Sequence, residues 1–222
     1  MPDGTTDYEN LETLDLPLVN QCIKELCETG KTVLPIYDFV QEARSAETEP
    51  VDLMGGVCIV EGIHAFNPAL TSLVPAKEVY RVYAGLREEY CEEGRRVINT
   101  QNIRLCRRML RDAATRGRSP AKTLSMWDRV LDGETRYIKG FKSSADFLLD
   151  TSFTYELGII AQLLQIVRRQ FTLEGHNAEL WDDTARRFEH VQPLPLELLP
   201  EDSMLREFYG GAADRRAQNA DV

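Results

Sequence analysis

Short apolar segments alternate with longer helical patterns along this chain, and this alternation constrains the fold more than any other feature. The segment "GGVCIVEG" (residues 55–62) is a continuous apolar run between glycines, which is typical of a strand buried in a parallel sheet. The segments "EVYRVYAGL" (78–86) and "ADFLLDTS" (145–152) predict two more strands. Strands that alternate with helices indicate an α/β fold, in which helices flank a parallel sheet. Three strands are few for a chain of 222 residues.

The helical patterns are longer and more regular than the strand patterns. Apolar residues recur every three to four positions in the segment 14–31, and Gly30 is placed to end that helix. Ser119 and Pro120 are placed as the N-cap and the first residue of another helix. The expected elements also include helices over 100–117, 119–138, 154–171 and 177–191, an edge strand or bend over 32–39, and a polar turn over 43–53.

The charge and cysteine content of the chain exclude several classes of protein. The formal net charge is −10 at pH 7, which argues against general nucleic-acid binding. No apolar run reaches the length of a membrane span, and the first residues lack the pattern of a secretory signal. The five cysteines form no C-x-x-C pair, which disfavours a zinc site. We therefore expect a cytoplasmic protein without a nucleic-acid or membrane partner, in which Cys58 and Cys106 are buried thiols.

A cluster of arginines stands out in this acidic chain. Its members are Arg104, Arg107, Arg108, Arg111, Arg116 and Arg118. The first four fall at helical spacings and share one broad face, and the last two flank Gly117 just past the helix. Guanidinium groups bind phosphate oxygens bidentately and keep their charge, so the cluster predicts a site for a multiply charged phosphate ligand. The alternative is a solvated helix face whose arginines pair with Asp112, Glu88 and Glu89.

Acidic and aromatic residues elsewhere are further candidates. Glu61 follows a predicted buried strand, where α/β proteins bind ligands, and is placed to orient Mg²⁺ or its water. Tyr37 is placed to stack on a base, and Arg44 to reach a phosphate. The carboxylates of "DYENLETLD" (7–15) are placed to accept hydrogen bonds from sugar hydroxyls. Each candidate has a structural alternative: a carboxylate that caps local amides, aromatic rings that pack under a hairpin, and an acidic N-cap for the next helix.

Five motifs of this chain, taken in order, resemble the uridine kinase/phosphoribulokinase family of P-loop kinases. They are "DYENLETLDLPLVNQCIKEL", "VLPIYDFV", "IVEGIHAFNPAL", "RRMLRDAATRGRS" and "SADFLLDTSFTYEL". Single motifs are weakly specific, but their joint order and spacing are specific. The resemblance covers residues 3–211 and is strongest to a bacterial branch of nucleoside kinases that often carries a TGS domain. It implies a P-loop NTPase-like α/β fold and transfer of the ATP γ-phosphoryl group to a nucleoside hydroxyl, with Mg²⁺.

The resemblance also implies which residues bind the nucleoside. Tyr8 and Glu9 match an aromatic and an acidic position, and the acidic one contacts the ribose hydroxyls in uridine kinases. Tyr37 matches an aromatic residue at the base. Arg108 and Arg111 match arginines on the nucleoside and phosphate side. Arg44, which is placed to reach a phosphate, completes the set. The expected substrate-binding residues are therefore Tyr8, Glu9, Tyr37, Arg44, Arg108 and Arg111.

Three residues carry the catalytic roles that the resemblance implies. Glu61 matches the strand-end acid near the metal, which holds Mg²⁺ directly or through a water. Arg116 and Arg118 match lid arginines that close on the phosphates of ATP. Charge stabilisation of this kind is what phosphoryl transfer requires.

One motif of the family does not occur in these residues. There is no G-x-x-x-x-G-K-[ST], the loop that cradles phosphates, and the strand ending in the presumed general base is also absent. We therefore expect residues 1–200 to be the C-terminal part of a kinase domain whose first strands are missing, 201–211 an extension packed on it, and 212–222 a disordered tail. Such a chain is expected to be inactive alone and to self-associate through open sheet edges. It would be a fragment, a mis-started gene model or one part of a split protein. The alternative is a pseudokinase that senses nucleotide.

Overall fold

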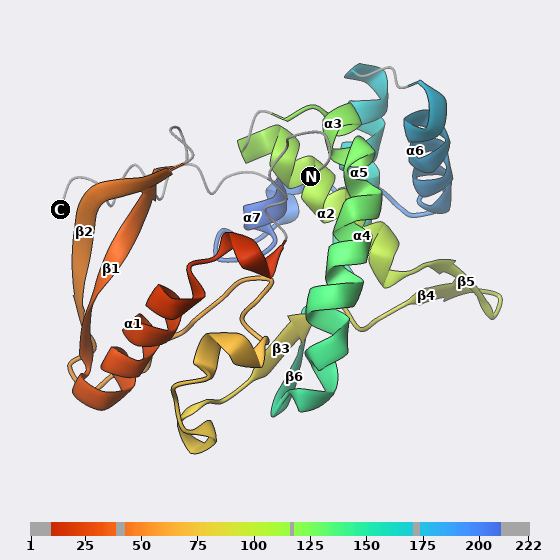
Figure 1. The fold of residues 1–222 in the computed structure, drawn as a ribbon. Coiled ribbons are helices and arrows are strands. Elements are labelled where there is room, and N and C mark those ends of the chain that lie inside the picture. Colours follow the sequence, from red (N-terminus) through yellow and green to blue (C-terminus); the bar gives the residue numbers. More distant parts are fainter. Residues whose placement is uncertain (1–9, 39–42, 116–117, 171–173, 210–222) are drawn as a thin grey trace. The chain divides into compact units, whose positions relative to one another are not determined.

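The computed structural model describes residues 10–38, 43–115, 118–170 and 174–209 (Figure 1). The chain divides into two compact units, Met1–Tyr83 with Val130–Leu148 and Ala84–Arg129 with Leu149–Val222. Each unit has its own helices and strands.

The first unit contains a helix packed on a β-hairpin. Helix α1 (Leu16–Thr29) contacts strand β1 (Lys31–Asp38), and β1 pairs in antiparallel fashion with β2 (Ala43–Asp52) (Figure 1). The side chain of Asp15 caps α1, and Gly30 ends it with a φ of 74°. Because an L-residue with a side chain rarely adopts this left-handed conformation, glycine suits the helix end. The predicted helix and its end at Gly30 are confirmed.

The strand β2 was not expected, because residues 43–53 were predicted to form a polar turn. That prediction was wrong. Lys31 lies opposite Asp52 in the hairpin, and Tyr37 lies opposite Arg44. Polar residues are compatible with a strand whose side chains stay in water, so the ladder of backbone hydrogen bonds decides the structure here.

A pair of parallel strands provides the α/β character of the fold. Strand β3 (Val82–Gly85) pairs with β6 (Phe147–Asp150). The amide of Phe147 donates to the carbonyl of Arg81, and the amide of Thr151 donates to the carbonyl of Gly85, each at 3.1 Å. Donor and acceptor both advance by four residues, so the strands are parallel. The predicted α/β class is confirmed, but this sheet has two strands among the described residues, not the three expected.

The missing third strand is the segment "GGVCIVEG". Residues 55–62 form no strand, and Val57 and Ile59 are each 87% exposed. The prediction of a buried strand at this segment was therefore wrong, and Cys58 is exposed rather than buried. An apolar run becomes a strand only when neighbouring strands satisfy its backbone groups, and no strand in the described part of the chain pairs with it.

This exposure leads to a first prediction. Replacing Val57 and Ile59 together by Thr should change the free energy of unfolding by about 0.5 kcal/mol or less, because neither side chain is packed. The same double variant should weaken any self-association of the chain, measured by sedimentation velocity, because it removes exposed apolar surface. As a buried reference, Ile160→Ala should cost about 2–5 kcal/mol in urea unfolding. A comparable cost for the double variant would mean that the segment is packed in solution.

The second unit is mainly helical. It contains a short hairpin of β4 (Tyr90–Glu92) and β5 (Arg95–Ile98), which the sequence did not predict. Glu93 and Gly94 connect these strands with positive φ angles, as a two-residue hairpin turn requires. The helices are α2 (Thr100–Thr115), α3 (Pro120–Ser125), α5 (Glu156–Gln170), α6 (Gly175–Arg187) and α7 (Arg206–Tyr209). Their core is formed by fully buried side chains that include Ile103, Cys106, Met109, Ile160 and Leu205.

The helix predicted over 119–138 is interrupted. Ser119 caps its first segment, α3, and Pro120 is the first helical residue, as expected. The hydroxyl of Ser125 then bonds back to the carbonyl of Lys122, and side-chain competition of this kind weakens a helix end. The segments that follow are α4 (Trp127–Gly133) and a π-helical turn (Glu134–Ile138). The other short helices are 3₁₀ turns at Leu11–Thr13, Pro68–Thr71, Ala76–Glu78, Lys139–Ser144 and Leu196–Leu198.

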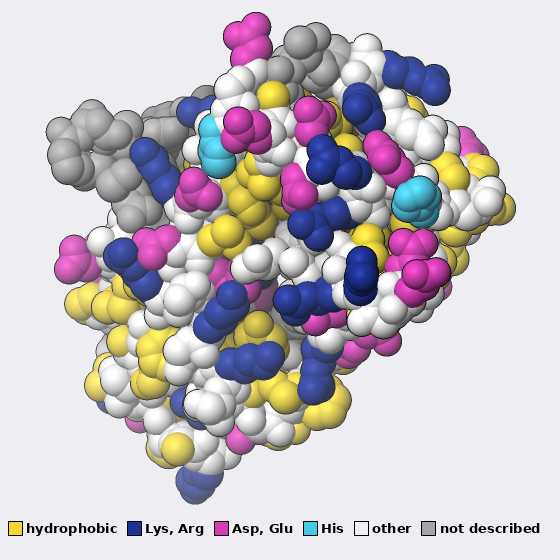
Figure 2. Space-filling view, turned by 90° about the vertical axis from the view of Figure 1, so that its right-hand side faces the viewer, with side chains coloured by type: hydrophobic (Ala, Val, Ile, Leu, Met, Phe, Trp, Pro, Cys, Tyr) yellow, Lys and Arg dark blue, Asp and Glu magenta, His cyan; other side chains and the backbone are white. Residues whose placement is uncertain are grey.

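The surface carries both signs of charge. Basic and acidic side chains are interspersed on the face shown in Figure 2, with hydrophobic side chains between them. None of the helices in the described part of the chain is long and apolar enough to cross a bilayer. Cys106 is fully buried as predicted, and this burial, with Glu156 nearby, raises the pKa of its thiol.

Candidate functional site

Helix α2 carries most of the arginine cluster, so its local structure decides where each guanidinium lies. Asn99 and Asn102 exchange side-chain hydrogen bonds with each other's amides at 3.0 Å, which fixes the start of the helix. Its apolar residues Ile103, Cys106 and Met109 are buried and set the phase of the helix. The arginines therefore differ in environment although their spacing in the sequence is similar.

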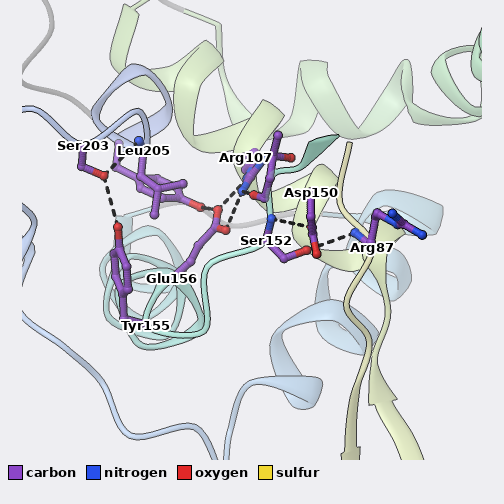
Figure 3. A network of polar contacts seen from close by, with 10 residues as sticks. Arg87, Arg107, Asp150, Ser152, Tyr155, Glu156, Ser203 and Leu205 are labelled. Carbon is purple, nitrogen blue, oxygen red and sulfur yellow. Dashed lines mark hydrogen bonds and ion pairs between the residues drawn. The ribbon is translucent and has the colours of Figure 1, made fainter. Parts of the chain in front are cut away.

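Arg107 points into the interior of the second unit. Its guanidinium donates to both carboxylate oxygens of Glu156, at 2.6 and 2.7 Å, and to the carbonyl of Thr151 at 2.7 Å (Figure 3). The side chains of Arg107 and Glu156 are 8% and 1% exposed. Burial disfavours the charge of Arg107, but the bonds to Glu156 outweigh it and raise the pKa of this guanidinium. Arg107 thus holds an internal carboxylate, and it does not belong to a solvent-facing phosphate site.

Glu156 has a second partner from the end of the chain. The hydroxyl of Tyr209 donates to Glu156 Oε1 at 2.5 Å, and burial together with this carboxylate raises the pKa of Tyr209 well above its usual value. Glu156 is also the first residue of α5, where the helix dipole favours negative charge. The buried carboxylate therefore joins α2, α5 and α7. Sequence reasoning missed this network, although an acid at a helix start is a recognisable signal.

Two predicted substrate arginines, Arg108 and Arg111, remain partly exposed; we call them the arginine pair. Their side chains are 22% and 21% exposed, and their Nε atoms lie 4.0 and 3.8 Å from the buried carboxylate of Asp112. Thr123 donates a hydrogen bond to that carboxylate at 3.3 Å. The pairing with Asp112 is the contact that the structural alternative anticipated. Both side chains are partly exposed, so the pair can still be reached by a ligand anion.

The two lid arginines follow the end of α2. Arg118 is exposed, and its amide donates to the carbonyl of Asp112 at 3.1 Å. Arg116 lies outside the described residues. Within the second unit, the structure thus brings Arg118 to the end of the helix that carries the arginine pair.

The base and ribose candidates belong to the first unit. Tyr37 is 44% exposed on β1, and Arg44 is its cross-strand neighbour on β2. Arg44 donates to the Asp15 carboxylate at 2.8 Å, and this hydrogen bond lowers the pKa of Asp15. Tyr8 and Glu9 lie outside the described residues. An exposed tyrosine beside a cation on an open hairpin is compatible with a stacking role and with a purely structural one.

Glu61 is exposed in the irregular segment that precedes a short turn. The amide of Ala65 closes that turn on the carbonyl of Gly62, whose φ is 142°. His64 is buried beside Tyr137, with ring centroids 5.0 Å apart. Across the described ranges, no three His, Cys, Asp or Glu side chains come together as a metal site. Mg²⁺ often takes only one or two protein carboxylates and completes its shell with phosphates and water, so the chemistry of Glu61 fits that role.

A partial match to a phosphate loop is accounted for structurally. The tripeptide Gly30–Lys31–Thr32 repeats the last three residues of that motif, but it follows a helix and opens a strand, whereas a phosphate loop follows a strand and opens a helix. Lys31 pairs with Asp52 at 2.7 Å, and the Thr32 hydroxyl donates to Glu25 at 2.6 Å. These residues therefore hold α1 and the hairpin together.

Comparisons with known proteins agree on one family. Residues 3–77 match the model of the Phosphoribulokinase / Uridine kinase family. The chain is 26% identical over 145 residues to the uridine kinase of Saccharomyces cerevisiae, covering 64% of this chain and 26% of that protein. It is 30% identical over 148 residues to the uridine kinase of Lactobacillus helveticus, covering 64% and 60%. It is also 30% identical over 149 residues to that of Staphylococcus carnosus, covering 65% and 62%. The chain therefore spans less than two thirds of each of these relatives.

Proposed function

We propose that this chain, which matches the model of the phosphoribulokinase/uridine kinase family over residues 3–77, belongs to that family and forms part of a nucleoside kinase that transfers the γ-phosphoryl group of ATP to a nucleoside hydroxyl. The observation that carries this proposal is the similarity to uridine kinases, which extends over about two thirds of the chain. The arginine pair and the exposed Arg118 supply the cationic groups that such chemistry needs at the phosphates.

The arginines have distinct proposed tasks. Arg108 and Arg111 bind on the nucleoside and phosphate side, with their guanidiniums held in place by the buried Asp112. Arg116 and Arg118 follow the helix and close on the phosphates of ATP. Guanidinium groups suit both tasks, because they remain charged and bind oxygens in pairs.

The nucleoside itself is assigned to the first unit. Tyr37 stacks on the base, Glu9 accepts hydrogen bonds from the ribose hydroxyls beside Tyr8, and Arg44 contacts a phosphate. Arg44 must exchange its ion pair with Asp15 for that contact, and this exchange is feasible because exposed pairs contribute little stability. Glu61 is the protein group for Mg²⁺, acting directly or through a water. When bound, the metal neutralises charge on the transferred phosphoryl group.

A binding measurement tests the proposal. In isothermal titration of ATP–Mg²⁺ into the purified chain, Arg116→Ala/Arg118→Ala and Arg108→Ala/Arg111→Ala should each weaken binding by about tenfold or more, because each removes charge-assisted hydrogen bonds. The control is Arg186→Ala, which removes an exposed positive charge from α6. In a longer protein that contains this chain with a phosphate loop, loss of both lid arginines should lower kcat about 30-fold, equivalent to about 2 kcal/mol. If all variants bind ATP with equal affinity, these arginines form a solvated helix face and do not bind phosphate.

A further inference from the structure

The end of the described chain packs on the helix that carries the arginine pair. Helix α7 contacts α2 within the second unit. Leu205, just before α7, is fully buried, and Tyr209 at its end is 4% exposed. The guanidinium of Arg206 donates to the carbonyls of Pro200 and Leu199, which fixes the turn that leads into α7. This segment, residues 205–209, is therefore anchored at both ends; we call it the C-terminal clasp.

Between its two anchors, the clasp presents two side chains to the arginines. The ring of Phe208 lies 4.9 Å from the guanidinium carbon of Arg107 and 6.0 Å from that of Arg111. Glu207 places its carboxylate 3.9 Å from Nη1 of Arg111. Of the two arginines, Arg107 is already bound by the buried Glu156. The clasp therefore acts mainly on the partly exposed Arg111.

The contacts of Arg111 differ in strength. Asp112 is 1% exposed and belongs to the same helix, so this contact persists whether or not a ligand is present. Glu207 is 65% exposed, and an exposed pair at 3.9 Å is weak and screened by water. An arriving phosphate oxygen can therefore replace Glu207 but not Asp112. The Phe208 ring meanwhile supports the guanidinium by a cation–π contact that does not compete for its N–H groups.

We propose that the C-terminal clasp sets the affinity of Arg111 for phosphate. Phe208 positions the Arg111 guanidinium, and the carboxylate of Glu207 pairs with this guanidinium until a phosphate displaces it. This inference rests on the proposed function, because it assigns Arg111 to a phosphate. It makes Glu207 and Phe208 positioning residues with opposite effects. Removal of the carboxylate frees the guanidinium for phosphate, and removal of the ring leaves the guanidinium less well oriented.

The test is to measure the dissociation constants of ATP and of inorganic triphosphate for the full chain at low salt. Glu207→Gln should tighten the binding of both about two- to fivefold, the range expected for loss of one exposed ion pair. Phe208→Leu should weaken both about two- to fivefold, since an exposed cation–π contact has a similar energy. Glu197→Gln, which changes an exposed acid in the 3₁₀ turn Leu196–Leu198, is the control for net charge. The Arg111 Nε–H resonance should shift in Glu207→Gln without ligand and not in Glu197→Gln.

The outcomes separate this inference from the proposed function. If Arg108→Ala/Arg111→Ala weakens binding while Glu207→Gln behaves like Glu197→Gln, the clasp has no effect on affinity and the inference is wrong. If Arg108→Ala/Arg111→Ala leaves binding unchanged, the proposed function of the pair fails. A Phe208→Leu variant that loses stability in urea but keeps its affinity would reduce Phe208 to a packing residue and would also overturn its positioning role.

Discussion

Replacing Glu156 by Ala should lower the free energy of unfolding by about 3–5 kcal/mol, as measured by urea denaturation. The carboxylate accepts hydrogen bonds from Arg107 and Tyr209, and all three side chains are buried. Its removal leaves a guanidinium charge and a phenol in the interior with their principal acceptor gone. An uncompensated buried charge is among the most damaging changes a fold can undergo.

The reference for this experiment is an ion pair of the same kind at the surface. Arg96 and Glu89 are 3.0 Å apart, with side chains 60% and 40% exposed. Glu89→Ala should therefore cost about 1 kcal/mol or less. The triple variant Arg107→Met/Glu156→Leu/Tyr209→Phe should recover much of the loss, because well-packed apolar residues can replace a buried polar network and no buried donor is then left without its acceptor. If Glu156→Ala costs no more than Glu89→Ala, the network is not formed in solution.

The second large effect concerns catalysis. The purified 222-residue chain should not phosphorylate uridine, cytidine or other nucleosides above background with ATP–Mg²⁺, in an assay that follows phosphate transfer directly. Phosphoryl transfer relies on loop amides and a lysine around the phosphates, and this sequence contains no complete G-x-x-x-x-G-K-[ST]. Lys31 is the lysine of the partial match, and its ion pair with Asp52 ties it to the hairpin.

To interpret this result, nucleotide binding should be measured on the same protein preparation. Binding that depends on the arginine pair, without turnover, agrees with a chain that needs further kinase elements and also with a nucleotide-sensing protein that does not catalyse. Co-expression with a segment that carries a phosphate loop distinguishes these two cases, because only the first gains activity. Robust Mg²⁺-dependent turnover by the chain alone would contradict the prediction and require another group to cradle the phosphates.

Local signals in the sequence predicted the elements whose structure is decided locally. Gly30 and Ser119 mark helix ends through backbone conformation and capping, and both were assigned correctly. The strongly apolar helix α5 was also predicted, because its periodicity extends over several turns. The strand errors have a different cause. Segment 55–62 reads as a buried strand and segment 43–53 as a turn, yet backbone pairing decides both: 43–52 pairs with the preceding strand β1, and 55–62 has no pairing strand among the described residues.

The candidate site could be predicted only in part, because local spacing places residues on a helix but does not show which distant residues they contact. Spacing identified a helix rich in arginine, but it did not distinguish Arg107, which is buried, from Arg108, which is partly exposed. That difference depends on where Glu156 reaches α2, and Glu156 is 49 residues further along the chain. The roles of Tyr37, Glu61 and the lid arginines came from resemblance, and these roles stay predictions.

The carboxylate of Glu156 couples positions 107, 156 and 209, because it is the shared acceptor of the other two side chains. A change at any one of them removes a donor or the common acceptor of the other two, so single substitutions should be rare among close relatives and compensated sets more frequent. An alignment of such relatives should show these three columns covarying, although 102 residues separate the first from the last. Anyone who shortens the chain from its C-terminus would pass through this coupled set at Tyr209, well before reaching any residue assigned to the substrate.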